Sequence, residues 1–312
     1  MWYVDFGGDA YDDREADHVV SAIERACETD PRAALRLVAE YSSHWWSRGL
    51  QDEAAAAAER VLSMLGRTVP VGMDEEYLLA VLHGAASAEH EQLELAEQIV
   101  LGTAGPFRYS LTVLLWSLVF GPFESASVVE EVLARNESGD AWTRAAVELC
   151  RGYPGLTTAT PGEAEQALRT ALGRFRMLDD GWGMFLALTA LRQVVDEPLD
   201  ITNEAVEVAE QLGLAEETGL LLCQRADLYL RLGKLEDAHE DYSQALTIGE
   251  RADLPETAAV ARIGLARSAR YAGNLAAARE YLADVLTSTS DEDARAEALH
   301  ELDAVEACEA SA

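Results

Sequence analysis

The sequence predicts an all-α protein made of antiparallel helix pairs stacked in series. Three observations predict it. Ala, Leu and Glu dominate a chain with only eight Pro and six Phe, no strand-like alternation of useful length occurs, and similar residues recur at a fixed interval in the second half. With 49% hydrophobic residues, the 312-residue chain has enough apolar side chains to fold. We expect about seven helix pairs and one further helix at each end, wound as a right-handed superhelix.

Shifting the chain against itself by 40 residues aligns similar residues in a single register. The aligned residues are Ala226 with Ala266, Gly233 with Gly273, Leu235 with Leu275, Ala238 with Ala278, Glu240 with Glu280, Leu246 with Leu286 and Thr247 with Thr287. Small residues let two helices cross closely, and a glycine supplies the left-handed turn after a first helix. The order small, aromatic, Gly, Ala, aromatic, Ala resembles the tetratricopeptide repeat. The expected fold is therefore a tetratricopeptide-like α-solenoid, with its clearest repeats at 216–252 and 256–290.

Apolar periodicity places the other helices, and Gly- and Pro-rich stretches separate them. The expected end helices are 14–27 and 292–308, and the expected upstream helices are 35–46 with 53–65, 75–88 with 91–101, and 111–120 with 125–134. The recurring second-helix position falls at Ala171, Ala205, Ala245 and Val285, with spacings of 34, 40 and 40 residues. The short spacing predicts an abbreviated turn or a short second helix near 196–198. We expect an N-terminal tail at 1–11, one helical-repeat domain at 12–312, and a hinge at 152–162.

The charge balance excludes several functions. The chain has 56 acidic and 24 basic residues, a formal charge of −32, and Lys234 is its only lysine. Such a chain is not expected to bind nucleic acid directly, because phosphate binding depends on Lys and Arg. A nucleotide-binding P-loop is also excluded, because Gly233-Lys234 precedes Leu235 in place of Ser or Thr. The acidity fits either salt adaptation or a GC-rich genome that favours Arg over Lys, and we favour the second.

The remaining motifs indicate neither an enzyme nor a membrane protein. The four cysteines lie too far apart for a metal-binding pair, and no Gly-x-Ser-x-Gly elbow occurs. His83 and His90 would share a helix face only if the residues between them were helical. The chain start lacks the features of a signal peptide, and the longest apolar run, 111–120, is shorter than the roughly 20 residues of a membrane helix. We expect a cytoplasmic, non-enzymatic protein with no metal, no cofactor and no membrane contact.

Several segments, taken in order, resemble one family. The segments are Glu15-Ala16-Asp17-His18, Asp30-Pro31-Arg32-Ala33-Ala34-Leu35-Arg36-Leu37, Trp46-Ser47-Arg48-Gly49, Asp140-Ala141-Trp142-Thr143-Arg144-Ala145 and Phe175-Arg176-Met177-Leu178-Asp179-Asp180-Gly181-Trp182-Gly183. Together with the two clear repeats, they are similar to the C-terminal tetratricopeptide region of AfsR-type actinobacterial transcriptional regulators of the SARP group. The resemblance covers roughly residues 12–290. It implies a chain that works with a winged-helix activator region and a nucleotide-binding switch module.

The repeat phase predicts which residues line a concave groove. First helices line the concave face of tetratricopeptide arrays, which would present Asp227, Arg231, Arg267 and Arg270 among their residues. An arginine cluster in an acidic protein could receive a carboxylate or a phosphate, or its members could pair internally. Trp182 and Phe185, at the start of a first helix, are further groove candidates.

The adjacent tryptophans at 45 and 46 allow two interpretations. They could form an aromatic ligand platform, or Trp46 could pack in the core while Trp45 covers the groove, and we favour the second. For the whole chain, the expected function is a sensory or protein-interaction domain of a transcriptional regulator, which binds a partner protein, a sister domain or a small effector. The alternative is a stand-alone scaffold or adaptor without a transcriptional role.

Overall fold

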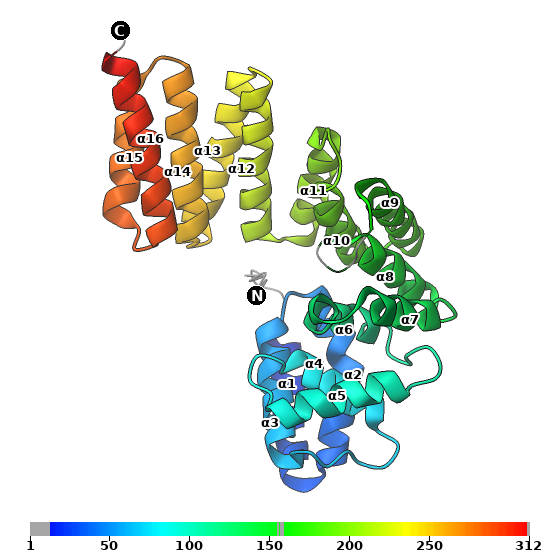
Figure 1. Ribbon diagram of the computed structural model, residues 1–312. Helices are drawn as coiled ribbons and strands as arrows, with labels where there is room; N and C mark the ends of the chain where they lie inside the picture. The colour runs from blue at the N-terminus through cyan, green and yellow to red at the C-terminus, as the bar shows by residue number, and fades with distance from the viewer. Residues whose placement is uncertain (1–12, 155, 157–158, 311–312) are drawn as a thin grey trace. The chain divides into compact units, whose positions relative to one another are not determined.

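The computed structural model describes residues 13–154, 156 and 159–310, so the expected tail at 1–11 lies outside the described residues. Within those ranges the chain forms sixteen α-helices and a short 3-10 helix, without strands. Six consecutive pairs pack on each other, α2 with α3, α4 with α5, α6 with α7, α8 with α9, α12 with α13 and α14 with α15, and α1 and α16 are the first and last helices (Figure 1). The predicted all-α solenoid is confirmed.

The chain divides into two compact units, Met1–Pro198 and Leu199–Ala312. The helices of unit 1 are α1 (Asp13–Thr29), α2 (Pro31–Ser47), α3 (Gln51–Leu65), α4 (Asp74–His83), α5 (His90–Gly102), α6 (Thr112–Val119), η1 (Gly121–Phe123), α7 (Ala126–Asn136), α8 (Ala141–Gly152), α9 (Pro161–Leu178) and α10 (Gly181–Leu191). Those of unit 2 are α11 (Leu199–Leu212), α12 (Ala215–Arg231), α13 (Leu235–Arg251), α14 (Pro255–Tyr271), α15 (Leu275–Ser288) and α16 (Glu292–Ala310). The division falls beside the short repeat spacing near 196–198, and the expected hinge at 152–162 lies inside unit 1.

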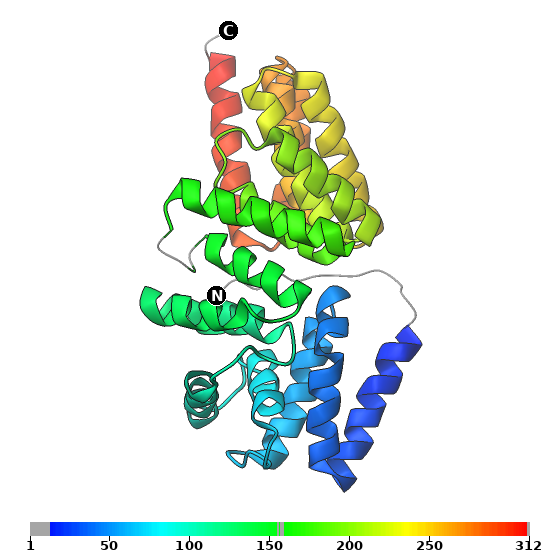
Figure 2. The ribbon, with the colours of Figure 1, turned by 90° about the vertical axis from the view of Figure 1, so that its right-hand side faces the viewer.

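Each unit is built from neighbours in sequence. In unit 1, α1, α2 and α3 pack side by side, and the first helices α2, α4, α6, α8 and α10 contact one another in series (Figure 2). In unit 2, α12, α14 and α16 contact in series, while α13 and α15 pack on them from behind (Figure 1). This arrangement exposes a face of first helices and a face of second helices.

Local sequence signals fix where the helices begin and end. Gly233 and Gly273 end α12 and α14 with φ values of 72° and 77°, the left-handed conformation expected from the repeat. Asp140 and Asp180 cap α8 and α10 by accepting hydrogen bonds from the backbone N–H of Thr143 and Gly183, at 2.7 and 2.6 Å. These carboxylates therefore cap the two helices.

The short repeat has a different geometry from the one expected. The first helix α10 is the short member, with 11 residues, whereas the second helix α11 has 14. The connection between them, residues 192–198, is longer than the three-residue turn at 232–234. The expected abbreviated turn is therefore absent, whereas the second helix α11, with 14 residues, is shorter than the second helices α9 and α13, with 18 and 17. The apolar run of α10 ends at Leu191, a turn follows at 192–194, and Pro198 disfavours helical backbone at the residue before it.

Candidate partner-binding site

The first-helix face of unit 2, formed by α12, α14 and α16, carries an ion-pair network centred on Arg267. The Arg267 guanidinium on α14 donates to Asp227 of α12 at 2.9 Å and to Glu297 of α16 at 2.8 Å. Its Nε lies 3.6 Å from Glu301 of α16. Burial alone would lower the pKa of Arg267, but the surrounding negative charges outweigh burial and raise it. One side chain thus links three first helices.

Arg270 extends the network at the C-terminal end of α14. Its Nε donates to the buried carboxylate of Glu301 at 2.5 Å, and its guanidinium lies 4.6 Å from the centre of the Tyr271 ring. Hydrogen bonding to Glu301 raises the pKa of Arg270, against the opposing effect of burial. Glu301, which is almost fully buried, is therefore compensated by two arginines.

Asp227 also joins this network to the core of unit 2. The hydroxyl of buried Tyr242 donates to Asp227 at 2.6 Å. Burial, with the charge of Asp227, raises the pKa of Tyr242 above its ordinary value. Behind it, Arg225 makes a two-pronged contact with the buried carboxylate of Asp241, with both N–O distances at 2.7 Å. Hydrogen bonds to buried Tyr242 and ion pairs within unit 2 thus fix the positions of the polar groups on this face.

Two members of the predicted arginine cluster, Arg267 and Arg270, are brought together, but both already have partners. Arg267 and Arg270 pair with carboxylates of α12 and α16, as the internally paired alternative describes. Arg231 is exposed at the end of α12. Val260, which the repeat phase also places on this face, and Tyr271, which it does not single out, are 37% and 57% exposed on α14. Spacings of seven and eleven residues from Val260 place Arg267 and Tyr271 on one stripe of α14.

Trp182 and Phe185 do not line an accessible groove, and this part of the prediction is wrong. They are only 4% and 3% exposed, and their rings stack with centroids 5.6 Å apart. Trp182 also meets Trp46 of α2 edge to face, with centroids 6.4 Å apart. The first helix α10 is apolar on nearly all sides, so these rings fill the interior of unit 1.

The adjacent tryptophans take the opposite roles from those expected. Trp45 is fully buried and packs edge to face on the His83 ring, with centroids 6.2 Å apart. Trp46 is half-buried. The Ser42 hydroxyl lies 2.6 Å from Nε2 of His83, and burial lowers the pKa of His83 to about 4. The cluster therefore holds a neutral imidazole in the core.

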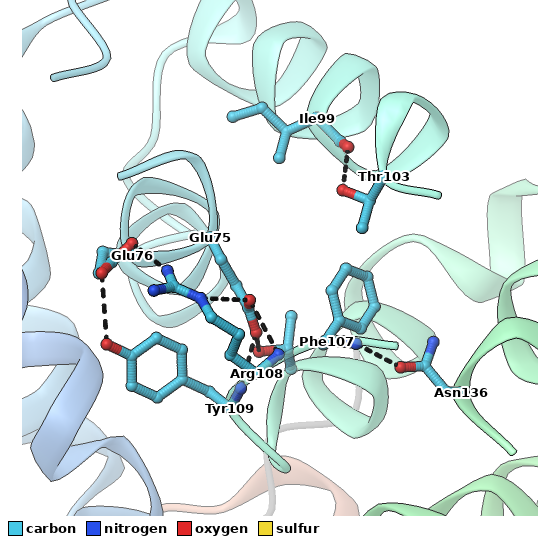
Figure 3. A network of polar contacts seen from close by, with 9 residues as sticks. Glu75, Glu76, Ile99, Thr103, Phe107, Arg108, Tyr109 and Asn136 are labelled. Atoms are coloured by element: carbon cyan, nitrogen blue, oxygen red, sulfur yellow. Dashed lines mark hydrogen bonds and ion pairs between the residues drawn. The ribbon is translucent and has the colours of Figure 1, made fainter. Parts of the chain in front are cut away.

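A second polar network, which sequence reasoning missed, joins α4 to the loop before α6 (Figure 3). Glu75 accepts hydrogen bonds from the backbone N–H groups of Arg108 and Tyr109, at 2.9 and 2.8 Å, and from the Thr112 hydroxyl at 3.1 Å. Arg108 also donates to buried Glu76 at 2.7 Å. Burial and the charge of Glu76 raise the pKa of Tyr109 to about 12. The adjacent glutamates were the only signal in the sequence.

The same close-up shows how this loop is held at its other end. The backbone N–H of buried Phe107 donates to the side-chain carbonyl of Asn136 at 2.9 Å, and the Thr103 hydroxyl donates to the Ile99 carbonyl at 2.7 Å (Figure 3). The contacts of Glu75 and Asn136 therefore hold the loop against α4 and α7.

The described residues contain no group of three or more His, Cys, Asp or Glu placed to hold a metal ion. His83 ends α4 and His90 begins α5, so the two imidazoles do not share a helix. Among the residues with assigned positions, no helix is both long enough and apolar enough to span a bilayer. Cys27, Cys150 and Cys223 are buried free thiols, and Cys308 is an exposed one.

Comparison with known proteins identifies the fold. No protein-family model matches the chain, and no curated protein matches it. Among solved structures, the chain is similar to a Signal Transduction ATPase with Numerous Domains protein with a tetratricopeptide repeat sensor from Pyrococcus horikoshii, with a TM-score of 0.52 and 13% identity. The match covers 75% of this chain and 40% of that one, so the chain spans less than half the length of this neighbour. A circular tandem repeat protein aligns at a TM-score of only 0.16.

Proposed function

We propose that this chain is a non-enzymatic protein-interaction domain that binds a partner through the first-helix face of unit 2. The observation that carries the proposal is the stripe of exposed side chains on α12 and α14, which includes Arg231, Val260 and Tyr271. These groups stand beside a network that fixes the backbone and side chains around them. A face ordered before binding loses less conformational entropy when a partner docks.

The finer proposal concerns the partner. The family resemblance supports a role as the sensory part of an AfsR-type transcriptional regulator, in which binding biases a nucleotide-dependent switch module. The similar ATPase carries a tetratricopeptide sensor, which fits the same arrangement. In this proposal the partner is a sister domain of the regulator or a protein that reports to it, and the chain itself contacts no nucleic acid and no membrane in the cytoplasm.

The first experiment concerns the genetic context and the direct interaction. The reading frame upstream of the codon for Met1 is inspected, and any P-loop module encoded there is purified and titrated against this chain by calorimetry. A continuous frame with a P-loop module that binds supports the regulator. A start codon with its own ribosome site favours the stand-alone adaptor.

The second experiment concerns the face. The double variant Arg231→Glu/Val260→Glu changes two exposed positions on α12 and α14, and we expect it to weaken partner binding at least tenfold. The matched control is Arg67→Glu/Val71→Glu, the same change of charge at two exposed positions of unit 1. Equal binding by the wild type and both variants would remove the first-helix face from the proposal.

A further inference from the structure

Unit 2 has a groove on the side of its second helices, away from the Arg267 network. The groove has a volume of about 640 Å³ and runs between α13 and α15, over the C-terminal end of α14. Its lining includes Leu235, Glu236, His239, Glu240, Ala277 and Tyr281. We call it the second-helix groove.

The groove exists because small side chains face it and no polar contact closes it. Ala269 of α14, Ala272 just after it and Ala277 of α15 leave space beside the ring of Tyr281. Among the hydrogen bonds and ion pairs found in the described part of unit 2, none joins α13 to α15. By contrast, Gln244 of α13 donates to Glu210 of α11 at 3.4 Å. A hydrogen bond therefore bridges α13 to α11 on one side, whereas none bridges α13 to α15 on the other side.

The chemistry of the groove is apolar inside and acidic at the rim. Leu235 and Tyr281 are half-buried, whereas Glu236 and Glu240 are exposed one helical turn apart on α13. Every lining residue with a permanent charge is a glutamate. The surrounding unit has the same sign, with 9 basic and 24 acidic residues between positions 199 and 312.

This charge pattern favours a positively charged ligand in the groove. A second copy of this chain would bring a further −32 to an acidic rim, so self-association there is opposed. A nucleic acid is opposed for the same reason. The volume admits one or two large side chains, and the rim favours a cation on either side of them.

We propose that the second-helix groove binds a basic peptide segment of a partner protein, in which an aromatic or aliphatic side chain fills the groove and flanking Arg or Lys residues contact Glu236 and Glu240. This inference rests on the proposed interaction function for its biological setting, but it concerns a separate surface. The net negative field of the unit would also speed association with such a segment, in a manner that salt suppresses.

The test uses the full chain and a fluorescein-labelled eight-residue peptide that has two arginines on each side of a central Trp-Leu pair. Binding is followed by fluorescence anisotropy at two salt concentrations, and amide shifts in the ¹H–¹⁵N spectrum locate the site. We expect shifts confined to α13, α15 and the end of α14. A peptide with glycines in place of Trp and Leu should bind at least tenfold more weakly, because it retains the charge without the groove-filling side chains.

Two variants probe the groove and two serve as controls. Ala277→Leu fills the groove without a change of charge and should weaken peptide binding at least tenfold. Glu236→Gln/Glu240→Gln should weaken it about three- to tenfold, since exposed charge pairs contribute only modestly. The control Glu292→Gln/Asp293→Asn removes two negative charges at the start of α16 and should change binding less than twofold. Arg231→Glu/Val260→Glu should leave peptide binding unchanged, which separates this surface from the first-helix face.

Undiminished binding to a folded Ala277→Leu variant would overturn the groove as the binding site. Equal effects of the two charge-removing variants would also overturn it, because the peptide would then be responding to overall charge. A loss of regulator binding in Arg231→Glu/Val260→Glu with intact peptide binding would support both surfaces independently.

Discussion

Gly264, in the middle of α14, is predicted to be essential for the packing of unit 2. A Cβ atom at this position would lie 2.1, 2.3 and 2.5 Å from three atoms of the Tyr242 ring, where ordinary contacts begin near 3.4 Å. The ring cannot simply move aside, because Tyr242 is 1% exposed and its hydroxyl is held by Asp227 at 2.6 Å. We therefore expect Gly264→Ala to separate α13 from α14.

The magnitude follows from two opposing effects. Overpacking a well-filled core costs about 1–3 kcal/mol, and an overlap of this size belongs near the upper end. Replacing Gly by Ala inside a helix stabilises the folded state by about 1 kcal/mol, because alanine has the higher helix propensity. The expected net loss is about 1–2 kcal/mol in the free energy of unfolding. With a urea dependence of about 2 kcal/mol per M, the middle of the usual range, the unfolding midpoint should fall by roughly 0.5–1 M.

Urea unfolding followed by circular dichroism measures the loss, and hydrogen exchange with peptide resolution locates it in α13 and α14. In a Tyr242→Leu background the obstructing ring is absent, so the cost of Gly264→Ala should vanish or change sign. Gly183→Ala repeats the test in unit 1, since a Cβ there would lie 2.2 Å from the Phe175 ring, and Gly173→Ala in α9, where a Cβ would meet nothing within 4 Å, is the control. A Gly264→Ala protein as stable as the wild type, or the same cost in both backgrounds, would refute the packing argument.

Three further predictions concern titratable side chains that are buried or half-buried. Folding lowers the pKa of His83 from 6.5 to about 4. The neutral imidazole therefore stabilises unit 1 above pH 6.5, and this stability is lost as the pH falls toward 4. The urea unfolding midpoints of the wild type and His83→Gln should converge over that pH interval. Glu75→Gln should cost about 1–3 kcal/mol because backbone donors lose a charged acceptor, whereas Asp74→Asn, an exposed neighbour, should cost less than 0.5 kcal/mol. Arg225→Met should cost about 3 kcal/mol by leaving Asp241 buried and unpaired, and Arg225→Met/Asp241→Leu should recover most of that loss in thermal unfolding.

The repeat in the second half predicts the fold because each recurring residue has a local physical role. Gly233 and Gly273 mark turns that need a left-handed residue, and Ala226 and Ala238 mark crossings where both side chains are fully buried. Such roles depend only on neighbours a few residues away, so a single sequence reveals them. The structure places the helices of unit 2 within a few residues of these predictions.

The glycine inside α14 shows where that reasoning ends. Gly264 gives no turn signal, and in a sequence it resembles an ordinary weak helix position. Its role depends on Tyr242, a residue of the preceding helix whose rotamer no local pattern sets. Close approach of two helices is a tertiary property, which explains why this position was not among the predicted core contacts.

Predictions about the site residues were right where they depended on helical spacing and wrong where they depended on tertiary contacts. The stripe containing Asp227 and Arg267 could be predicted, because helical spacing places equivalent residues on one face. The partners of Arg267 could not, because Glu297 and Glu301 lie 30 or more residues away on a helix that the sequence identified only as an end helix. Trp182 lies at the start of a first helix, as predicted, but the helix is apolar all round and the ring turns inward.

The distribution of charge connects the two surfaces of unit 2. On the first-helix face, Arg267 and Arg270 are matched by Asp227, Glu297 and Glu301. The second-helix groove has only glutamates among its permanently charged lining residues. A basic segment approaching unit 2 is therefore attracted to the groove more than to the internally neutralised face. In these two proposals, the first-helix face, where arginines and carboxylates compensate one another, would take a partner without a strong net charge, and the second-helix groove would take a basic one.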